Sequence, residues 1–198
     1  MASKNTPAER KSEPKPKITL MWTYRGSIEE VWDLWTTKEG LESWWGPEEF
    51  FTRVRRLDLR PGGDFEYATT ATDLSQVEAL NAAGRPITRI GRITFLEVVP
   101  QKRLVYRTSI DYIPDVPPYD VTALIEFSTV EPGVRMVATQ DAMHNSEWTQ
   151  KSAIDMDRQF NRLAKVIEGR RQAEQENLMS TPSGQNPDGV PSREKERL

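Results

Sequence analysis

Residues that could carry out chemistry are few in this chain of 198 residues. It contains one histidine, His144, and no cysteine. The lack of cysteine excludes disulfides, thiolate metal sites, iron–sulfur clusters and cysteine nucleophiles. A lone histidine excludes multi-histidine metal centres, and no nucleophile motif accompanies it that would make it a general base. We therefore assign no catalytic residue, expect His144 at the surface or near a helix cap, and predict no metal and no cofactor.

Four arginines cluster around one predicted strand, at positions 53, 55, 56 and 60. Alternation along a strand places positions 53 and 55 on the same face. Such a cluster forms either a solvated, salt-bridged surface or a site for an acidic partner or a ligand carboxylate. The surface interpretation is favoured here.

The most conspicuous apolar feature is the run Trp44-Trp45-Gly46-Pro47. One of the two tryptophans is expected to fill the core where two short helices meet a sheet. The other can border the mouth of a cavity, because an indole offers a large apolar wall with one polar N–H group. Both Trp44 and Trp45 are therefore candidate ligand-binding residues.

A second group of apolar side chains is predicted to face the space between a sheet and a long helix, from strand alternation and helical spacing. Its members are Phe65, Tyr67, Tyr106, Ile125, Met136, Met156 and Phe160. Two interpretations stay open. These side chains form a filled core, or they line a small-molecule cavity, whose walls are typically apolar with few polar groups. The methionines fit both interpretations, since their flexible side chains adapt to gaps and to varied ligands.

Composition and charge narrow the class of protein. The net charge is -3 and the pI is about 5.4, which argues against a nucleic-acid-binding protein. No apolar run approaches the roughly 18 residues of a membrane span. The N-terminal sequence lacks the apolar centre of a signal peptide, so we expect a cytoplasmic protein.

The chain divides into three parts by composition. Residues 1–17 contain no aromatic residue and no Ile, Leu or Val, and residues 170–198 also lack aromatic residues. Such segments cannot bury enough apolar surface to offset the entropy of ordering, so we expect a disordered N-terminal tail and a mostly disordered C-terminal tail. Within the latter, residues 170–179 have the propensity to extend a helix. Residues 18–169 hold every Trp, Phe and Tyr, and they suffice for one packed domain.

The pattern of elements within residues 18–169 indicates an α+β domain. An alternating strand over residues 18–25 precedes the capping box Ser27-Ile28-Glu29-Glu30 and two short helices. Six further strands follow, and their short turns predict an antiparallel sheet. Residues 71–86 predict a longer loop with one helical turn. The spacing of apolar residues then predicts a long helix over residues 147–168, ended by Gly169.

Several stretches, in this order and spacing, are similar to those of a known family. They are SIEEVWDLWT (27–36), LESWWGP (41–47), LDLRPGGDF (57–65) and PQKRLVY (100–106). Over about residues 18–168 the chain resembles the branch of the START-like (SRPBCC) superfamily that is named after the activator of heat shock protein 90 ATPase, in its C-terminal domain.

The resemblance implies the helix-grip, birch-pollen-allergen-like fold, a curved seven-stranded antiparallel sheet around a long C-terminal helix, with two short helices closing one end. Such folds usually enclose an apolar cavity, so the implied function is binding of an apolar or amphipathic small molecule there. One alternative is a cofactor-free enzyme of the polyketide cyclase type. Its candidate polar groups are Glu97, Arg107, Tyr67 and Tyr106. The other alternative is a co-chaperone-like stimulator of a heat-shock ATPase. Fold alone does not choose among these, and a homodimer is left open.

Overall fold

The computed structural model describes residues 16–180, which fold into seven strands and four helices. The strands are β1 (Lys17–Tyr24), β2 (Phe50–Leu57), β3 (Asp64–Ala71), β4 (Thr88–Val99), β5 (Arg103–Ile110), β6 (Tyr119–Val130) and β7 (Gly133–Asp141). The helices are α1 (Ile28–Thr36), α2 (Lys38–Trp44), α3 (Leu74–Ala82) and α4 (Ser146–Ser180). Most of the disorder expected for the tails falls on residues 1–15 and 181–198, which lie outside the described residues.

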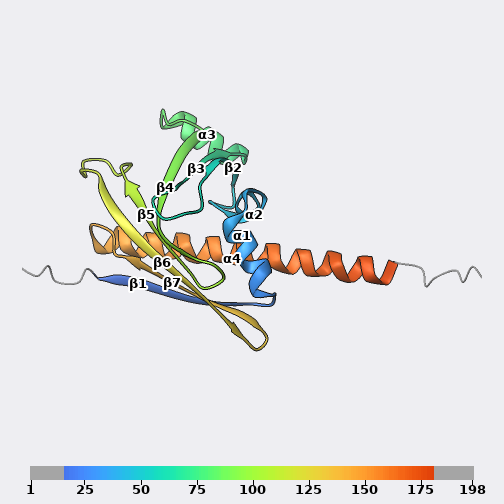
Figure 1. The fold of residues 1–198 in the computed structure, drawn as a ribbon. Coiled ribbons are helices and arrows are strands. Elements are labelled where there is room, and N and C mark those ends of the chain that lie inside the picture. The colour runs from blue at the N-terminus through green and yellow to red at the C-terminus, as the bar shows by residue number, and fades with distance from the viewer. Residues whose placement is uncertain (1–15, 181–198) are drawn as a thin grey trace, which may run out of the picture.

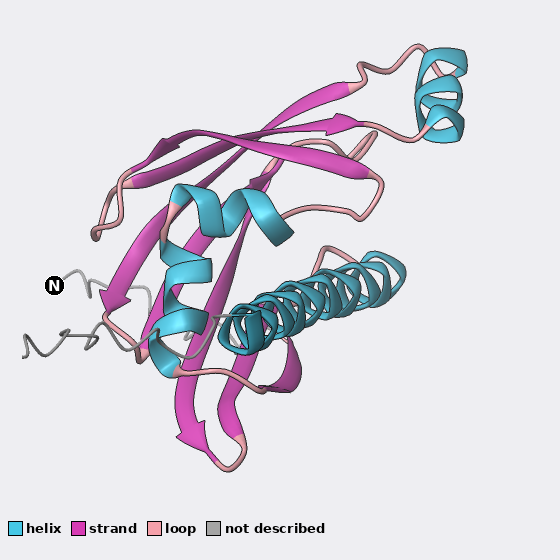
Figure 2. Ribbon diagram, turned by 90° about the vertical axis from the view of Figure 1, so that its right-hand side faces the viewer, coloured by secondary structure: helices cyan, strands magenta, loops and turns pink. Residues whose placement is uncertain are grey.

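The strands form one antiparallel sheet with the order β1-β7-β6-β5-β4-β3-β2 (Figure 1). The sheet curves around α4, and α1 and α2 close one end of the concave face (Figure 2). This arrangement confirms the predicted α+β helix-grip fold. Strand β1 begins at Lys17, which pairs with Asp141. The sheet therefore starts one residue before the predicted domain boundary.

Local sequence explains the two short helices at the start of the domain. The Ser27 hydroxyl accepts a hydrogen bond from the Glu30 N–H at 3.0 Å, and Thr37 does the same for Gly40 at 3.0 Å. Each bond satisfies an amide that the first helical turn leaves without a partner. Helix α1 then buries one apolar face, made of Val31, Trp32, Leu34 and Trp35.

Helix α3 extends the single helical turn that was predicted between β3 and β4. Asp73 caps it by accepting hydrogen bonds from the backbone of Ser75 and Gln76. None of its residues is buried, and it lies at the far end of the β3–β4 arm (Figure 1). A local cap thus starts this helix, although no apolar core supports it.

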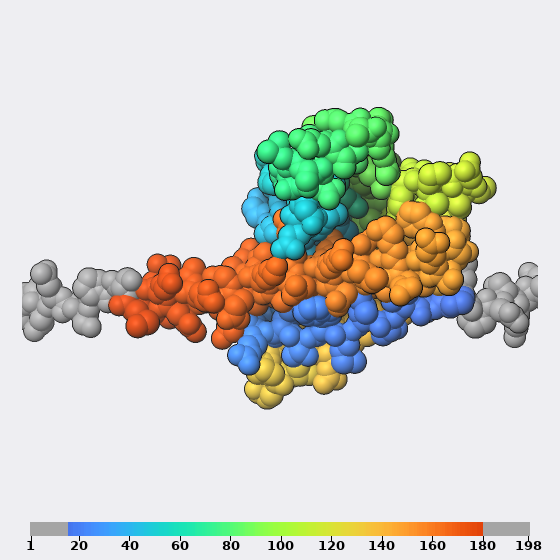
Figure 3. Space-filling model, turned by 180° about the vertical axis from the view of Figure 1, so that it is seen from behind, coloured from blue at the N-terminus to red at the C-terminus, as the bar shows by residue number. Residues whose placement is uncertain are grey.

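Helix α4 is longer than the sequence predicted. It runs through Gly169 to Ser180, 35 residues in all, so the prediction that Gly169 ends it was wrong. A glycine inside a helix costs only about 1 kcal/mol relative to alanine, and good helix formers such as Arg170, Arg171 and Gln172 follow it. The C-terminal part of α4 projects beyond the rest of the domain (Figure 3).

The main core lies between the sheet and the central part of α4. Helix α4 lies along β1, where the Trp22 indole donates to Asp157 Oδ1 at 3.1 Å and the Tyr24 hydroxyl donates to the Phe160 carbonyl at 3.5 Å. The fully buried side chains of this core include Trp44, Phe65, Phe160, Leu163 and Ile167. A smaller apolar cluster, built on Ile110, Ile113, Val121 and Met143, packs near the start of α4.

Candidate functional site

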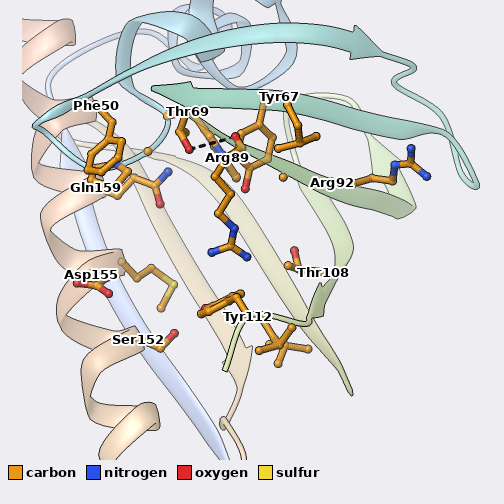
Figure 4. Close-up of a pocket in the computed structure, with 18 of the residues that line it drawn as sticks. Phe50, Tyr67, Thr69, Arg89, Arg92, Thr108, Tyr112, Ser152, Asp155 and Gln159 are labelled. Carbon is orange, nitrogen blue, oxygen red and sulfur yellow. Dashed lines mark hydrogen bonds between the residues drawn. The ribbon is translucent and has the colours of Figure 1, made fainter. Parts of the chain in front are cut away.

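An open cleft of about 1660 Å³ lies between the N-terminal half of α4 and the concave face of β3, β4 and β5. Its ends are formed by residues 45–50 on one side and by Asp111, Tyr112 and Pro114, after β5, on the other. Figure 4 shows side chains from these elements converging on the space beside α4. The cleft exists because α4 packs along β1 and leaves the opposite half of the curved sheet uncovered.

Aromatic rings form the inner wall of the cleft. The ring of Trp45 lies 5.7 Å from that of Tyr67 and 6.3 Å from that of Tyr106, centroid to centroid. Burial raises the pKa of both tyrosine hydroxyls above the ordinary value. Both phenols therefore stay neutral near pH 7 and offer flat apolar surfaces with a polar tip.

Tyr67 occupies its position because the facing residue on β4 has no side chain. Tyr67 pairs with Gly91, and a Cβ at position 91 would lie 2.3 Å from the Tyr67 ring. The phenol ring therefore lies directly over the β4 backbone. Only glycine at this position allows so close an approach.

Helix α4 supplies the opposite wall. Met156 and Phe160 give it an apolar surface, and both are less than one-tenth exposed. Ser152, Asp155 and Gln159 line the cleft from the same helix (Figure 4). The Ser152 hydroxyl accepts a hydrogen bond from the Gln140 side chain at 2.8 Å. This wall therefore mixes apolar and polar groups.

A polar group approaches the cleft from β4. The guanidinium of Arg89 points into the open space (Figure 4) and stacks on the ring of Tyr112, with Cζ 3.9 Å from the ring centroid. Asp111 lies beside it, with an Arg89 Nη2 to Asp111 Oδ1 distance of 3.5 Å. The cleft thus has a cation at the end opposite to Trp45.

The segment between α2 and β2 is held against α4 and closes one end of the cleft. Arg162 donates hydrogen bonds to the carbonyls of Pro47 and Phe50 at 2.8 and 3.3 Å, and partial burial lowers its pKa from the ordinary arginine value. Lys165 pairs with Glu48 at 2.8 Å. The hydroxyl of the fully buried Thr52 donates to the Trp45 carbonyl. These contacts fix Trp45 at the end of the cleft.

The nine predicted site residues fall into two groups. Five of them line the cleft, namely Trp45, Tyr67, Tyr106, Met156 and Phe160. The other four belong to the filled core and are at most 1% exposed, namely Trp44, Phe65, Ile125 and Met136. Trp44 donates its indole N–H to the Leu34 carbonyl at 2.8 Å, which suits a packing role. The side chains predicted to share one face therefore divide between the packed core and the wall of the cleft. Their role in binding a ligand stays a prediction.

Sequence reasoning missed Arg89, Tyr112 and Asp111. The signal for Arg89 was the alternation of β4, because position 89 shares a face with the buried Ile93 and Phe95. Tyr112 and Asp111 follow β5 in an irregular segment, where alternation gives no information.

The other residues weighed for chemistry lie outside the cleft. His144 is exposed, and its Nδ1 lies 3.2 Å from the Tyr119 hydroxyl. The arginines at positions 53, 55, 56 and 60 form exposed ion pairs with acidic neighbours. Within residues 16–180, no group of three or more His, Asp or Glu side chains is placed to hold a metal ion. Within the same range, no helix is both long and apolar enough to cross a membrane.

Comparison with known proteins identifies the family. A family model described as "Activator of Hsp90 ATPase homolog 1-like protein" matches residues 25–168. The chain belongs to this family, a branch of the START-like (SRPBCC) superfamily. No protein of curated function matches the chain significantly.

Solved structures of bacterial proteins share the fold. Protein CV1439 from Chromobacterium violaceum is 21% identical, with a TM-score of 0.63, and the match covers 77% of this chain and 96% of that one. Protein NE0264 from Nitrosomonas europaea is 25% identical with a TM-score of 0.57, covering 78% and 95%. The AHSA1-like protein from Aeromonas hydrophila is 18% identical with a TM-score of 0.60, covering 78% and 93%. These likenesses support the fold of the domain.

Proposed function

We propose that this protein binds an apolar or amphipathic small molecule in the cleft between α4 and β3–β5. The observation that carries the proposal is the wall of Trp45, Tyr67 and Tyr106 facing Met156 and Phe160 across an open space. Small-molecule sites typically combine such apolar and aromatic walls with a few placed polar groups. The cleft is larger than the roughly 300–1,000 Å³ of a typical site, because one side is open to solvent.

The enzyme alternative has less support from the cleft. Glu97 pairs with Arg103 and Arg107 pairs with Asp120, so these two candidate acid/base groups are engaged elsewhere. Tyr67 and Tyr106 line the cleft, but burial raises their pKa values further from neutrality. A general acid or base works best with a pKa near the working pH.

The co-chaperone alternative, the cytoplasmic location and the homodimer stay predictions. A protein-binding role would use outer surfaces of the domain and would not require an occupied cleft. Ligand binding in the cleft is therefore the property that separates the first proposal from this alternative.

The test is a titration of the protein with N-phenyl-1-naphthylamine, a neutral apolar dye. We expect one dye per chain, quenching of tryptophan emission, and a melting temperature that rises with dye concentration. A ligand at a hundred times its Kd stabilises the native state by about 2.7 kcal/mol.

A matched pair of variants locates the dye. Gln159→Trp places bulk on the cleft wall of α4, whereas Asn161→Trp places the same bulk on an exposed position of the same helix that does not line the cleft. We expect Gln159→Trp to abolish dye binding and Asn161→Trp to keep it. Equal binding by both variants, or no thermal shift of the parent protein, would contradict the proposal.

A further inference from the structure

We propose that the ligand is an amphipathic monocarboxylate and that Arg89 binds its carboxylate group. The proposal rests on the proposed function, since it names the ligand class of the same cleft. The first observation is the position of the Arg89 side chain. Arg89 lies on β4, and its guanidinium points into the cleft beyond the aromatic wall (Figure 4).

The stacking of Arg89 on Tyr112 fixes one face of the guanidinium and leaves its edge available. The ring centroid lies 3.9 Å from Cζ, so the phenol covers one planar face. A guanidinium carries five N–H donors around its edge, in a fork that fits a carboxylate through two parallel hydrogen bonds. The Arg89 side chain is thus oriented before any ligand arrives, which lowers the entropic cost of binding.

The existing partner of Arg89 engages it only loosely. Among residues 16–180, Arg89 makes one ion pair, with Asp111 at 3.5 Å, and the Asp111 side chain is 66% exposed. Close charge-assisted hydrogen bonds between a guanidinium and a carboxylate are about 2.7–2.9 Å long. An exposed pair of this kind is worth roughly 0–1 kcal/mol. A ligand carboxylate can therefore displace Asp111 at little cost.

Five other cations lie at or near the cleft. Two of them, Arg85 and Arg158, line it from exposed positions. The other three are engaged by partners. Arg92 lies three residues from Arg89 at the edge of the cleft, pairs with Glu66 at 2.8 Å, and points away from Arg89 (Figure 4). Arg162 donates to backbone carbonyls of the segment that closes one end. Lys151 pairs with Asp155 at 3.0 Å on the surface of α4. Among these six cations, Arg89 is the one whose guanidinium stacks on an aromatic ring and points into the cleft.

The charge around the cleft favours a single negative charge on the ligand. Five basic and five acidic side chains line it, so no net positive potential attracts a dianion or polyanion. One carboxylate matches the single charge of the Arg89 guanidinium, whose pairing with Asp111 is loose. A phosphate monoester would bring about two charges close to Asp111 and Asp155.

The register of the sheet indicates where the apolar part of the ligand would lie. Thr69 pairs with Arg89, and Tyr67 pairs with Gly91, so Arg89 and the Tyr67 ring are two residues apart along neighbouring strands. Two residues of a strand span about 6.8 Å. A carboxylate on Arg89 therefore directs an apolar chain or ring over Tyr67 toward Tyr106.

The test compares two ligands with the same apolar chain, decanoate with a charged head group and methyl decanoate with a neutral one, by calorimetry and by displacement of the naphthylamine dye. We expect the parent protein to bind decanoate about 10-fold more tightly than the ester. Arg89→Gln should remove this preference by weakening decanoate binding to about the affinity of the ester. Arg92→Gln, on the same strand, should keep the preference. Asp111→Asn should strengthen decanoate binding several-fold, since it removes a competing carboxylate.

The outcomes separate this proposal from the proposed function. Equal affinities for acid and ester, with normal dye binding, would overturn the assignment of Arg89 and leave the cleft as a site for neutral ligands. Tighter binding of decyl phosphate than of decanoate would overturn the choice of a monocarboxylate. Failure of dye, acid and ester alike to bind would overturn both proposals.

Discussion

The ring of Tyr67 lies where a side chain at position 91 would have to lie. A Cβ built on Gly91 comes within 2.3 Å of Tyr67 Cζ and 2.6 Å of its hydroxyl oxygen. The two residues face each other on β3 and β4. The shape of the aromatic wall is thus set by the absence of one methyl group on the neighbouring strand.

Substituting Gly91→Ala is expected to destabilise the domain by about 1–3 kcal/mol, as for other overpacked sites. The methyl group must push the Tyr67 ring into the cleft, so dye binding should weaken as well. Denaturant unfolding of both singles and the double variant with Tyr67→Leu measures the coupling. We expect Gly91→Ala to cost clearly less in the Tyr67→Leu background. An equal cost in both backgrounds would show that the clash lies elsewhere.

The two neighbouring tryptophans should behave differently in a ligand titration. Trp45 lines the cleft, whereas Trp44 is fully buried and donates to the Leu34 carbonyl. Trp45→Phe should therefore remove most of the ligand-induced quenching with a small loss of stability. Trp44→Phe should keep the quenching and lower stability by about 1–3 kcal/mol, because it leaves a buried carbonyl without its donor. Fluorescence titrations and melts of the two variants check both expectations.

Alkaline pH should unfold the protein through its buried tyrosines. Burial raises the pKa of Tyr24, Tyr67, Tyr106 and Tyr112, and the charge of Asp157 adds to the shift at Tyr24. The unfolded chain loses these protons near pH 10, whereas the folded chain keeps them. The free energy of unfolding is therefore unaffected below about pH 9 and falls as the pH rises above 10.

Ultraviolet absorbance of the phenolate, recorded together with circular dichroism, measures this behaviour. We expect most tyrosine ionisation to coincide with the loss of secondary structure. Tyr24→Phe and Tyr106→Phe should each make the alkaline loss of stability less steep. Complete ionisation of the folded protein near pH 10 would refute the burial of these hydroxyls.

Removal of the distal part of α4 should hardly change stability. Residues 172–179 are all exposed, so a chain that ends at residue 169 loses little buried surface. We expect its melting temperature to stay within about 5 °C of that of a chain ending at residue 180, less than 1–2 kcal/mol at this size. A chain ending at residue 164 is the control, since it also loses Ile167, which is 2% exposed. That control should melt at a much lower temperature.

Much of the fold could be predicted because its signals are local. The capping box at Ser27, the alternation along the strands and the apolar spacing of α4 each depend on neighbouring residues. The end of α4 was placed wrongly at Gly169, because a glycine can end a helix or lie within one. The helical propensity of residues 170–179, which was recognised, is what continues the helix here. The identity of residue 169 alone does not tell whether the helix ends there or continues.

The candidate site was predicted less completely, because alternation identifies the face of a residue and not what covers it. Tyr106 faces Ala123 on the next strand, and Ile125 lies two residues further along on the same face. Tyr106 and Ala123 line the cleft, whereas Ile125 is fully buried. The difference depends on where α4 crosses the sheet. That crossing is set by long-range packing.

Substitutions in helix α4 have different effects at its buried positions and at its cleft-lining positions. Phe160, Leu163 and Ile167 hold the helix in the core, so replacement there is penalised through folding. Ser152, Asp155 and Gln159 line the cleft and are not buried, so replacing them costs little folding stability. Mutations at these three positions can change what the cleft accepts without unfolding the domain. Substitutions on the cleft-facing positions of this helix can therefore accumulate at a smaller cost in folding stability than substitutions on its buried face.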